Sequence, residues 1–211
     1  GLISAKAQIL AGAADWPTYL EILAQATAIG GIILFSLISS WVFGREYSDR
    51  TVKDLLALPT PRYVIVAAKF ILISLWSTLL TVVIYLIGLG VGVIVALPPV
   101  PPEVIWQGMI TMAVTASLTI ALTTPIAFFA SAGHGYLPPM GVAILAVIFA
   151  QIAAVTGWGE YFPWSVPALY AGMVGPAYEN LGNASYIIVI LACLFGMGAT
   201  IAWWELADQT Y

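Results

Sequence analysis

Apolar residues fall into five long runs along the chain and do not alternate with polar ones. The runs cover residues 22–43, 64–97, 104–130, 140–157 and 184–204. A helix needs about 20 apolar residues, within a range of roughly 17–25, to cross the hydrocarbon core of a bilayer. A transmembrane barrel would show segments of about 10 residues with alternating hydrophobicity. We therefore predict an all-α, polytopic membrane protein, with five spanning helices in one transmembrane domain over residues 1–211.

Two further segments lie between these runs. Residues 44–62 hold a dense group of charges, in which Ser48 or Asp49 is suited to begin a short helix and the pair Pro59 and Pro61 to end it. We predict an amphipathic helix on the membrane surface there, and the alternative is a solvated loop anchored by Arg and Lys. Residues 158–183 are apolar but interrupted by prolines, so we predict short re-entrant or interfacial helices.

The composition excludes several classes of protein. Hydrophobic residues make up 62% of the chain and charged residues 8%, whereas about 25% of a typical soluble domain is charged. This composition excludes a soluble enzyme. The net charge of −4, without a basic stripe, excludes a nucleic-acid-binding protein. Most of the chain is therefore expected to lie in the lipid bilayer.

The sequence lacks the common motifs of catalysis and cofactor binding. Lys6, Lys53 and Lys69 are not preceded by the glycine of a P-loop. His134 and Cys193 are the one histidine and the one cysteine of the chain, too few for a metal cluster built from these ligands. We expect no catalytic residue, metal or cofactor in this chain, so that any ATP would bind to another polypeptide.

The basic residues set the expected orientation. Five of the six lie in or beside the segment between the first two runs: Arg45, Arg50, Lys53, Arg62 and Lys69. Because cytoplasmic loops are enriched in Lys and Arg, we place this segment and the C-terminus in the cytoplasm and residues 158–183 outside. The expected location is the plasma membrane of a prokaryote. Lys69 is expected to extend to the membrane surface, and Trp203 and Trp204 to lie at the membrane–water interface.

Polar residues within the runs are uncharged apart from Lys69. Five of them are candidates for one wall of a translocation pathway: Thr111, Thr115, Thr119, Thr123 and Gln151. Hydrogen bonds between packed helices are the alternative explanation. Pro125 is expected to kink the third helix near its cytoplasmic end. Gly88 and Gly92, like Gly196 and Gly198, are expected to allow close helix packing within the subunit, with a dimer contact as the alternative.

The segment from Phe43 to Arg62 carries a specific pattern. It reads F-G-R-E-Y-x-x-x-T-x-K-x-L-L-x-x-P-x-x-R and is followed by Lys69. This pattern resembles the first cytoplasmic loop of type-2 ATP-binding-cassette (ABC-2) transporter permeases and is most similar to the small bacitracin and lantibiotic export permeases. The matching residues are Glu46, Tyr47, Thr51, Lys53, Leu55, Leu56, Pro59, Arg62 and Lys69. Residues 161–170 more weakly resemble the short extracellular element of the same permeases.

The resemblance implies a coupling role for residues 44–62. In such permeases this loop docks into a groove on a separate cytoplasmic ATPase subunit, which binds ATP and magnesium. Charged side chains would fix the register of the contact through charge-assisted hydrogen bonds, while the apolar side fills the groove. The residues expected to contact the ATPase are Arg45, Glu46, Tyr47, Asp49, Arg50, Thr51, Lys53, Asp54 and Arg62.

The resemblance also implies an assembly and an activity. Two permease chains, as a homodimer or with a similar partner, would form the pathway of an exporter for an amphipathic or apolar substrate, such as a peptide antibiotic or a lipid. The family has six spans, so we expect a further N-terminal helix before these five, with a cleaved signal peptide as the alternative. The rival functions are a non-transport structural subunit of a larger membrane complex and an ion-coupled carrier. The absence of charge at mid-span makes the carrier the weakest of the three.

Overall fold

The chain folds into helices. The computed structural model describes residues 15–49, 51, 55, 59–173 and 181–206. In chain order the elements are α2 (Trp16–Ser48), α4 (Arg62–Ile94), α5 (Pro102–Ala121), α6 (Thr124–Ala132), α7 (Leu137–Val155), η1 (Gly159–Tyr161), η2 (Pro163–Ser165), α8 (Val166–Tyr170) and α9 (Asn183–Leu206). No strand occurs in this part of the chain, and the predicted all-α class is confirmed.

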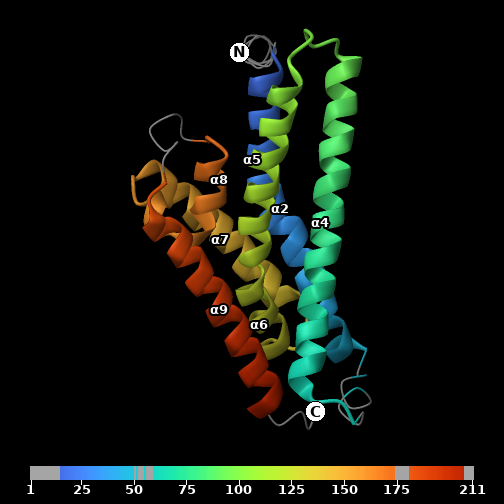
Figure 1. The fold of residues 1–211 in the computed structure, drawn as a ribbon. Helices are drawn as coiled ribbons and strands as arrows, with labels where there is room; N and C mark the ends of the chain where they lie inside the picture. The colour runs from blue at the N-terminus through green and yellow to red at the C-terminus, as the bar shows by residue number, and fades with distance from the viewer. Residues whose placement is uncertain (1–14, 50, 52–54, 56–58, 174–180, 207–211) are drawn as a thin grey trace.

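Within the described residues, five helical stretches are long and apolar enough to cross a membrane: α2, α4, α5 continued by α6, α7 and α9. They correspond one to one to the five predicted runs, and five spans are confirmed. Helices α4 and α9 lie close together at one end of the bundle and diverge toward the other (Figure 1). The end that holds Ser48, Arg62 and Leu206 is called the loop end below, and the other is called the opposite end.

The third run is divided into two helices before Thr124, where α6 begins. Pro125 lies in the first turn of α6 and provides no N–H for the carbonyl of Ala121. The Thr124 hydroxyl donates either to that carbonyl oxygen, 2.9 Å away, or to the carbonyl of Cys193 on α9, 3.0 Å away. The predicted kink at Pro125 is confirmed, and the neighbouring threonine replaces the missing backbone donor.

Glycines set the distances between neighbouring helices. A Cβ added to Gly88 or Gly92 would overlap side chains of α2, so both glycines seat α4 closely against α2. A Cβ added to Gly196 would overlap the backbone of Pro125, so this glycine lets α9 contact α6. A Cβ at Gly198 meets open space. The predicted packing within the subunit is therefore confirmed for Gly88, Gly92 and Gly196, and Gly198 takes no part in it.

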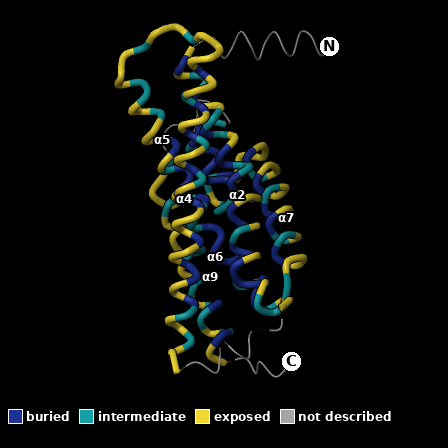
Figure 2. Tube along the Cα trace, turned by 90° about the vertical axis from the view of Figure 1, so that its right-hand side faces the viewer, coloured by how far each residue is buried: buried dark blue, intermediate teal, exposed yellow. Residues whose placement is uncertain are grey.

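Buried residues run along the inner faces of the helices (Figure 2), and two clusters of them lie toward the two ends of the bundle. The cluster at the loop end contains Val42, Phe43, Val66, Phe70, Ile73, Ala127, Ala130 and Trp204. The cluster toward the opposite end contains Trp16, Leu20, Tyr85 and Met112. The loop-end cluster joins α2, α4, α6 and α9, and it surrounds the polar contacts described below.

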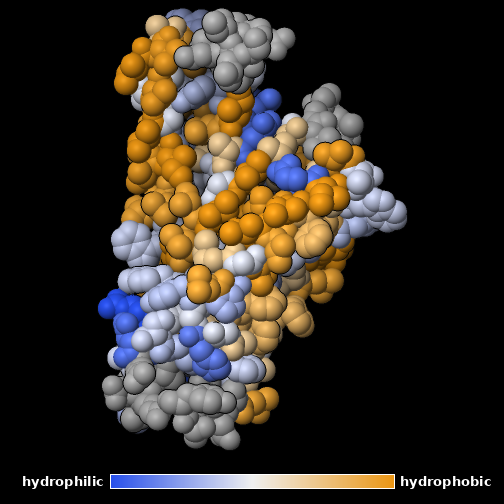
Figure 3. Space-filling model, turned by 180° about the vertical axis from the view of Figure 1, so that it is seen from behind, coloured by the Kyte–Doolittle hydropathy of each residue, from blue (hydrophilic) through white to orange (hydrophobic). Residues whose placement is uncertain are grey.

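Apolar side chains also cover much of the outside. Seen from behind, the surface is largely apolar, with polar side chains gathered mainly in its lower part (Figure 3). Where α4 and α9 diverge, a groove of about 910 Å³ is lined by α4, by the junction of α5 and α6, and by α9. Its lining is almost entirely apolar and includes Phe70, Thr123 and Cys193. An apolar surface of this extent suits helices surrounded by lipid.

Short helices occupy residues 158–183 as far as the structure describes them. Elements η1, η2 and α8 follow one another, and α8 packs on α2 and α5. Ala168 and Ala171 of this segment are buried with Ala24 and Ala28 of α2. The predicted short helices are thus present, and their re-entrant position in the membrane stays a prediction.

Candidate functional site

Helix α2 extends into the segment predicted to be a loop. It ends at Ser48, and Asp49 is its C-cap, with the Asp49 N–H 2.8 Å from the carbonyl oxygen of Arg45. The prediction that Ser48 or Asp49 begins a new helix is therefore wrong. The sequence has no proline between Pro17, in the first turn of α2, and Pro59, and Gly44 allows α2 to approach the backbone of the turn between α6 and α7. Most of the predicted amphipathic helix lies outside the described residues.

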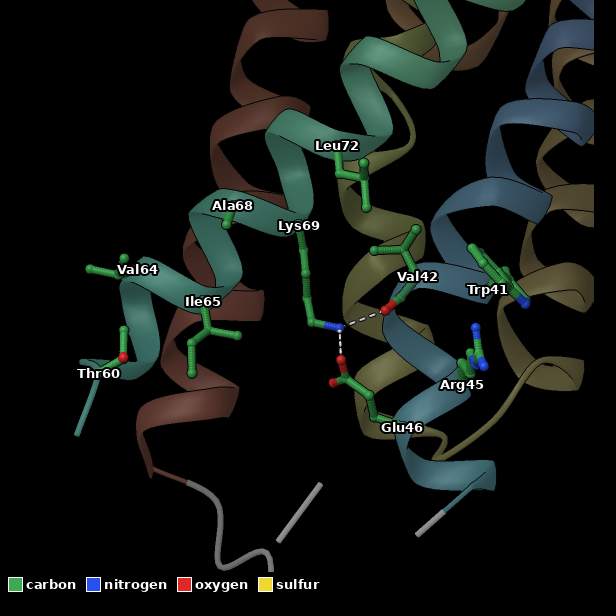
Figure 4. Close-up of a pocket in the computed structure, with 10 residues that line it drawn as sticks. All are labelled: Trp41, Val42, Arg45, Glu46, Thr60, Val64, Ile65, Ala68, Lys69 and Leu72. Carbon is green, nitrogen blue, oxygen red and sulfur yellow. Dashed lines mark hydrogen bonds and ion pairs between the residues drawn. The ribbon is translucent and has the colours of Figure 1, made fainter. Parts of the chain in front are cut away.

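Lys69 joins α4 to α2 and α9 from a buried position (Figure 4). Its side chain is 9% exposed, and its Nζ lies 2.6 Å from Glu46 Oε1 and 2.6 Å from the carbonyl oxygen of Val42, both on α2. The ammonium also lies 5.1 Å from the ring centroid of Phe43 and 5.4 Å from that of Trp204 on α9. The Lys69 ammonium therefore does not reach solvent, and a carboxylate, a carbonyl and two aromatic faces compensate its burial.

The ends of α4 and α9 exchange hydrogen bonds. Arg62 Nη1 donates to the carbonyl oxygens of Trp204, at 2.9 Å, and Glu205, at 3.4 Å. In return, Glu205 Oε1 accepts from the N–H of Tyr63 at 3.2 Å. The first N–H groups of α4 and the last carbonyl groups of α9 have no partner inside their own helices. The negative Glu205 therefore suits the positive end of the α4 dipole, and the positive Arg62 suits the negative end of the α9 dipole. The start of α4 is therefore fixed to the end of α9.

Trp204 lies at the centre of the loop-end cluster. Only 1% of this residue is exposed, and its ring meets those of Phe43 and Tyr47 edge to face, with centroids 6.2 and 6.3 Å apart. Its Nε1 donates to Ser131 Oγ on α6 at 3.0 Å. Trp204 is therefore buried between helices, where α6 supplies a hydrogen-bond acceptor for its N–H, and its position at the membrane–water interface stays a prediction.

Replacing Ser131 by alanine tests this hydrogen bond. The indole N–H of Trp204 would stay buried without its acceptor, and the free energy of unfolding is expected to fall by about 1–3 kcal/mol. Ser117→Ala is the matched control, because the Ser117 hydroxyl lies at an exposed position and bonds to a carbonyl of its own helix. Thermal unfolding in detergent measures both variants. Equal losses of stability in the two variants would show that the Trp204–Ser131 hydrogen bond contributes no more to the free energy of unfolding than the exposed Ser117 hydroxyl does.

Some charged side chains remain exposed at the end of α2. Arg45 Nε lies 3.0 Å from Asp49 Oδ2, and the two side chains are 56% and 49% exposed. The Arg45 guanidinium lies 5.2 Å from the ring centroid of Trp41. A cleft of about 510 Å³ separates this part of α2 from α4, and Figure 4 shows Lys69 and Glu46 meeting across it while Arg45 points toward Trp41. The end of α2 thus presents one ion pair outward and contributes to another inside.

The predicted ATPase-contact residues fall into three groups. Arg45, Asp49 and Thr51 are exposed. Glu46, Tyr47 and Arg62 make the contacts within the chain just described, with Tyr47 also stacked on His134 at a centroid distance of 4.9 Å. The remaining three, Arg50, Lys53 and Asp54, lie outside the described residues. A direct ATPase contact stays a prediction for all of them.

The five candidate pathway residues do not come together in one surface of this chain. Thr115 and Thr119 are fully buried on the inner side of α5, the helix against which α2 packs most extensively. Thr111 lines a groove of about 170 Å³ between α2 and α5, Thr123 lines the groove between α4 and α9, and Gln151 is exposed on α7. A pathway wall stays a prediction, because Thr111 is half-buried whereas Thr123 is only 2% exposed.

Sequence reasoning missed the partners of Lys69 and Trp204 and the role of Glu205. One signal was available, because an ionisable residue inside an apolar run requires a partner. Lys69 therefore called for an acidic residue near the same membrane depth, and Glu46 is the acidic residue that meets it. Nothing in the pattern of the sequence indicated that Ser131 accepts from Trp204.

Comparison with known proteins decides the family. The family model described as ABC-2 family transporter protein matches residues 12–150, which include α2, α4 and the Lys69–Glu46 pair. The chain belongs to the ABC-2 transporter family. It is therefore a multi-pass membrane permease, as the pattern around Glu46 and Tyr47 predicted.

A curated relative of this ABC-2 permease supports the same conclusion. The chain is 27% identical over 179 residues to the bacitracin transport permease protein BCRB of Bacillus licheniformis. The alignment covers 84% of this chain and 85% of the relative. No solved structure matches the chain.

Proposed function

We propose that this ABC-2 permease is the membrane-spanning subunit of an ATP-driven exporter, with its loop end in the cytoplasm. A separate ATPase subunit would bind ATP and magnesium and would contact the exposed end of α2. The observation that carries this proposal is the outward Arg45–Asp49 pair, with 56% and 49% of the two side chains exposed. These charges are available to a partner, whereas Glu46 and Lys69 pair with one another inside the bundle.

The distribution of charge supports this orientation. Arg45, Arg62 and Lys69 belong to the loop end, whereas Glu103 and Glu160 lie in the segments assigned to the outside. An excess of Lys and Arg on short loops marks the cytoplasmic side. The C-terminal end of α9, which Arg62 holds, would then also lie in the cytoplasm.

We further propose that two permease chains, identical or similar, form the pathway, and that the substrate is amphipathic or apolar. The printed name of the relative, a bacitracin transport permease, favours a peptide antibiotic over a lipid. Thr111 lines the groove between α2 and α5, and the exposed Ser74 and Thr78 line the groove between α4 and α9, so both grooves offer hydroxyl groups and apolar surface. Such surfaces suit a substrate that carries long apolar parts.

Exchanging the two exposed charges tests the ATPase contact. The double variant Arg45→Asp/Asp49→Arg keeps an ion pair with the same spacing on the helix and moves the cation closer to the C-terminus of α2, so the fold should be kept. It reverses the charges that a partner meets. Affinity for the ATPase is expected to fall by about tenfold or more, because misplaced like charges cost several kcal/mol and about 1.4 kcal/mol is a factor of ten.

The measurement is the amount of ATPase recovered with the tagged permease, together with the minimum inhibitory concentration of bacitracin for cells that express both proteins. Glu103→Gln is the matched control, because it removes an exposed charge at the first turn of α5, at the opposite end. If wild-type permease recovers no ATPase, the exporter proposal fails and the structural-subunit alternative is favoured. If the exchanged pair binds ATPase as well as wild type, the end of α2 is not the contact.

A further inference from the structure

Lys69 on α4 contacts both α2 and α9, and α4 and α9 converge at the loop end (Figure 1). Its ammonium contacts α2 through Glu46 Oε1 and the Val42 carbonyl, each at 2.6 Å. The same ammonium lies over the ring of Trp204 on α9. Trp204 is in turn tied through its carbonyl to Arg62, at the first residue of α4. One buried cation therefore holds the ends of α2, α4 and α9 in a fixed relation.

The residues next to Glu46 on α2 and next to Lys69 on α4 face different surroundings. On α2, the residue before Glu46 is Arg45, whose exposed side chain belongs to the proposed ATPase contact. On α4, the residue after Lys69 is Phe70, which lines the groove of about 910 Å³ between α4 and α9. Lys69 thus connects the end of α2 directly to the helix that forms one wall of this groove. Well-packed interfaces respond to a displacement by switching between arrangements and do not stretch continuously.

We infer that Lys69 is a positioning residue that keeps the exposed end of α2 in register with α4 and α9, so that movement imposed at that end changes the width of the groove. This inference rests on the proposed function. Lys69 does not itself contact the ATPase, because its side chain is buried and its partners belong to this chain. Its charge and its two hydrogen bonds, and not only its volume, carry the link.

Cys193 provides a native probe for this inference. It is the one cysteine of the chain, it is partly buried, and it lines the same groove. The permease, reconstituted with its ATPase in phospholipid vesicles, is treated with a membrane-permeant maleimide, with and without ATP plus vanadate. ATPase recovery is measured in the same preparations, so that loss of the subunit contact is seen separately from loss of the link. In wild type, nucleotide trapping is expected to change the labelling rate of Cys193.

The variants separate a positioning role from a merely structural one. Lys69→Met should still recover the ATPase but should lose the nucleotide-dependent change in Cys193 labelling. Lys69→Arg, which keeps a cation able to donate to Glu46 and to the Val42 carbonyl, should retain it. Where Lys69→Met is recovered poorly, Glu46→Gln/Lys69→Met replaces it, because this double variant leaves no unpaired buried charge, and the same loss is expected.

A nucleotide-dependent change that persists at full size without the Lys69 charge would overturn the inference while leaving the proposed function intact. A change lost equally in Lys69→Arg would also overturn it, because the role of Lys69 would then depend on shape alone. Failure of wild-type permease to recover any ATPase would overturn the proposed function, and this inference with it.

Discussion

Trp204→Ala is expected to be the most destabilising single substitution at the loop end. The side chain is 1% exposed and contacts Phe43, Tyr47 and the Lys69 ammonium, so its removal opens a cavity between α2, α4 and α9. Truncation of a buried tryptophan costs about 3–5 kcal/mol. Thermal unfolding in detergent measures the loss of stability, with the reaction of Cys193 with a thiol-specific fluorophore as the readout of unfolding. The variant should unfold at a much lower temperature than the wild type.

Two further variants serve as controls for this prediction. Phe195→Ala removes a large side chain from the same helix, but Phe195 is 71% exposed on the outside of the bundle, and we expect a small change. Trp204→Phe keeps the aromatic contacts and loses the hydrogen bond to Ser131, so its stability should fall between those of Ala and wild type. A Trp204→Ala protein as stable as Phe195→Ala would contradict the central position of Trp204.

Gly196→Leu is expected to separate α9 from α6. A side chain at this position would overlap the backbone of Thr124 and Pro125, and backbone cannot move aside as a flexible side chain does. Replacing glycine within a helix gains up to about 1 kcal/mol of helix propensity. Overpacking costs typically about 1–3 kcal/mol, and occasionally more. Because the overlap involves backbone, the cost should exceed the gain, and the variant should be strongly destabilised.

Gly198→Leu is the matched control for this substitution. Gly198 lies two residues further along α9, and a side chain there meets open space, so the gain in helix propensity should be kept. The fraction of each detergent-solubilised variant that stays monodisperse after heating measures the difference. Similar behaviour of the two variants would mean that α9 does not depend on the close approach at Gly196.

Much of the fold was predictable because membrane insertion depends on quantities that are local in sequence. The length and uniform hydrophobicity of each run determined five spans, and all five are present. Pro125 divides the third span as expected, because a missing N–H acts within its own helix. Gly88 and Gly92 indicated a close helix contact, although not that the partner would be α2.

The candidate site was predictable only in part. The charged segment was located correctly from its basic residues and from the family pattern around Glu46. The residue at which α2 ends was not predicted correctly, because Ser48 and Asp49 are equally suited to the end of one helix and to the start of another. In the structure the i,i+4 pair of Arg45 with Asp49 and the packing of Gly44 favour continuation of α2.

The sequence by itself determined that this chain lies in a membrane, which of its segments are long and apolar enough to cross it, and which segment carries most of its basic residues. Those properties follow from hydropathy, helix rise and charge counts, which are read along the chain. Only the tertiary structure decided that Lys69 turns inward to Glu46, 23 positions away, and that Trp204 is buried against α2 and α6. The physical reason is that a buried cation or indole N–H takes the partner that helix packing brings within hydrogen-bond distance. That packing depends on contacts such as Gly196 against Pro125, between helices far apart in sequence.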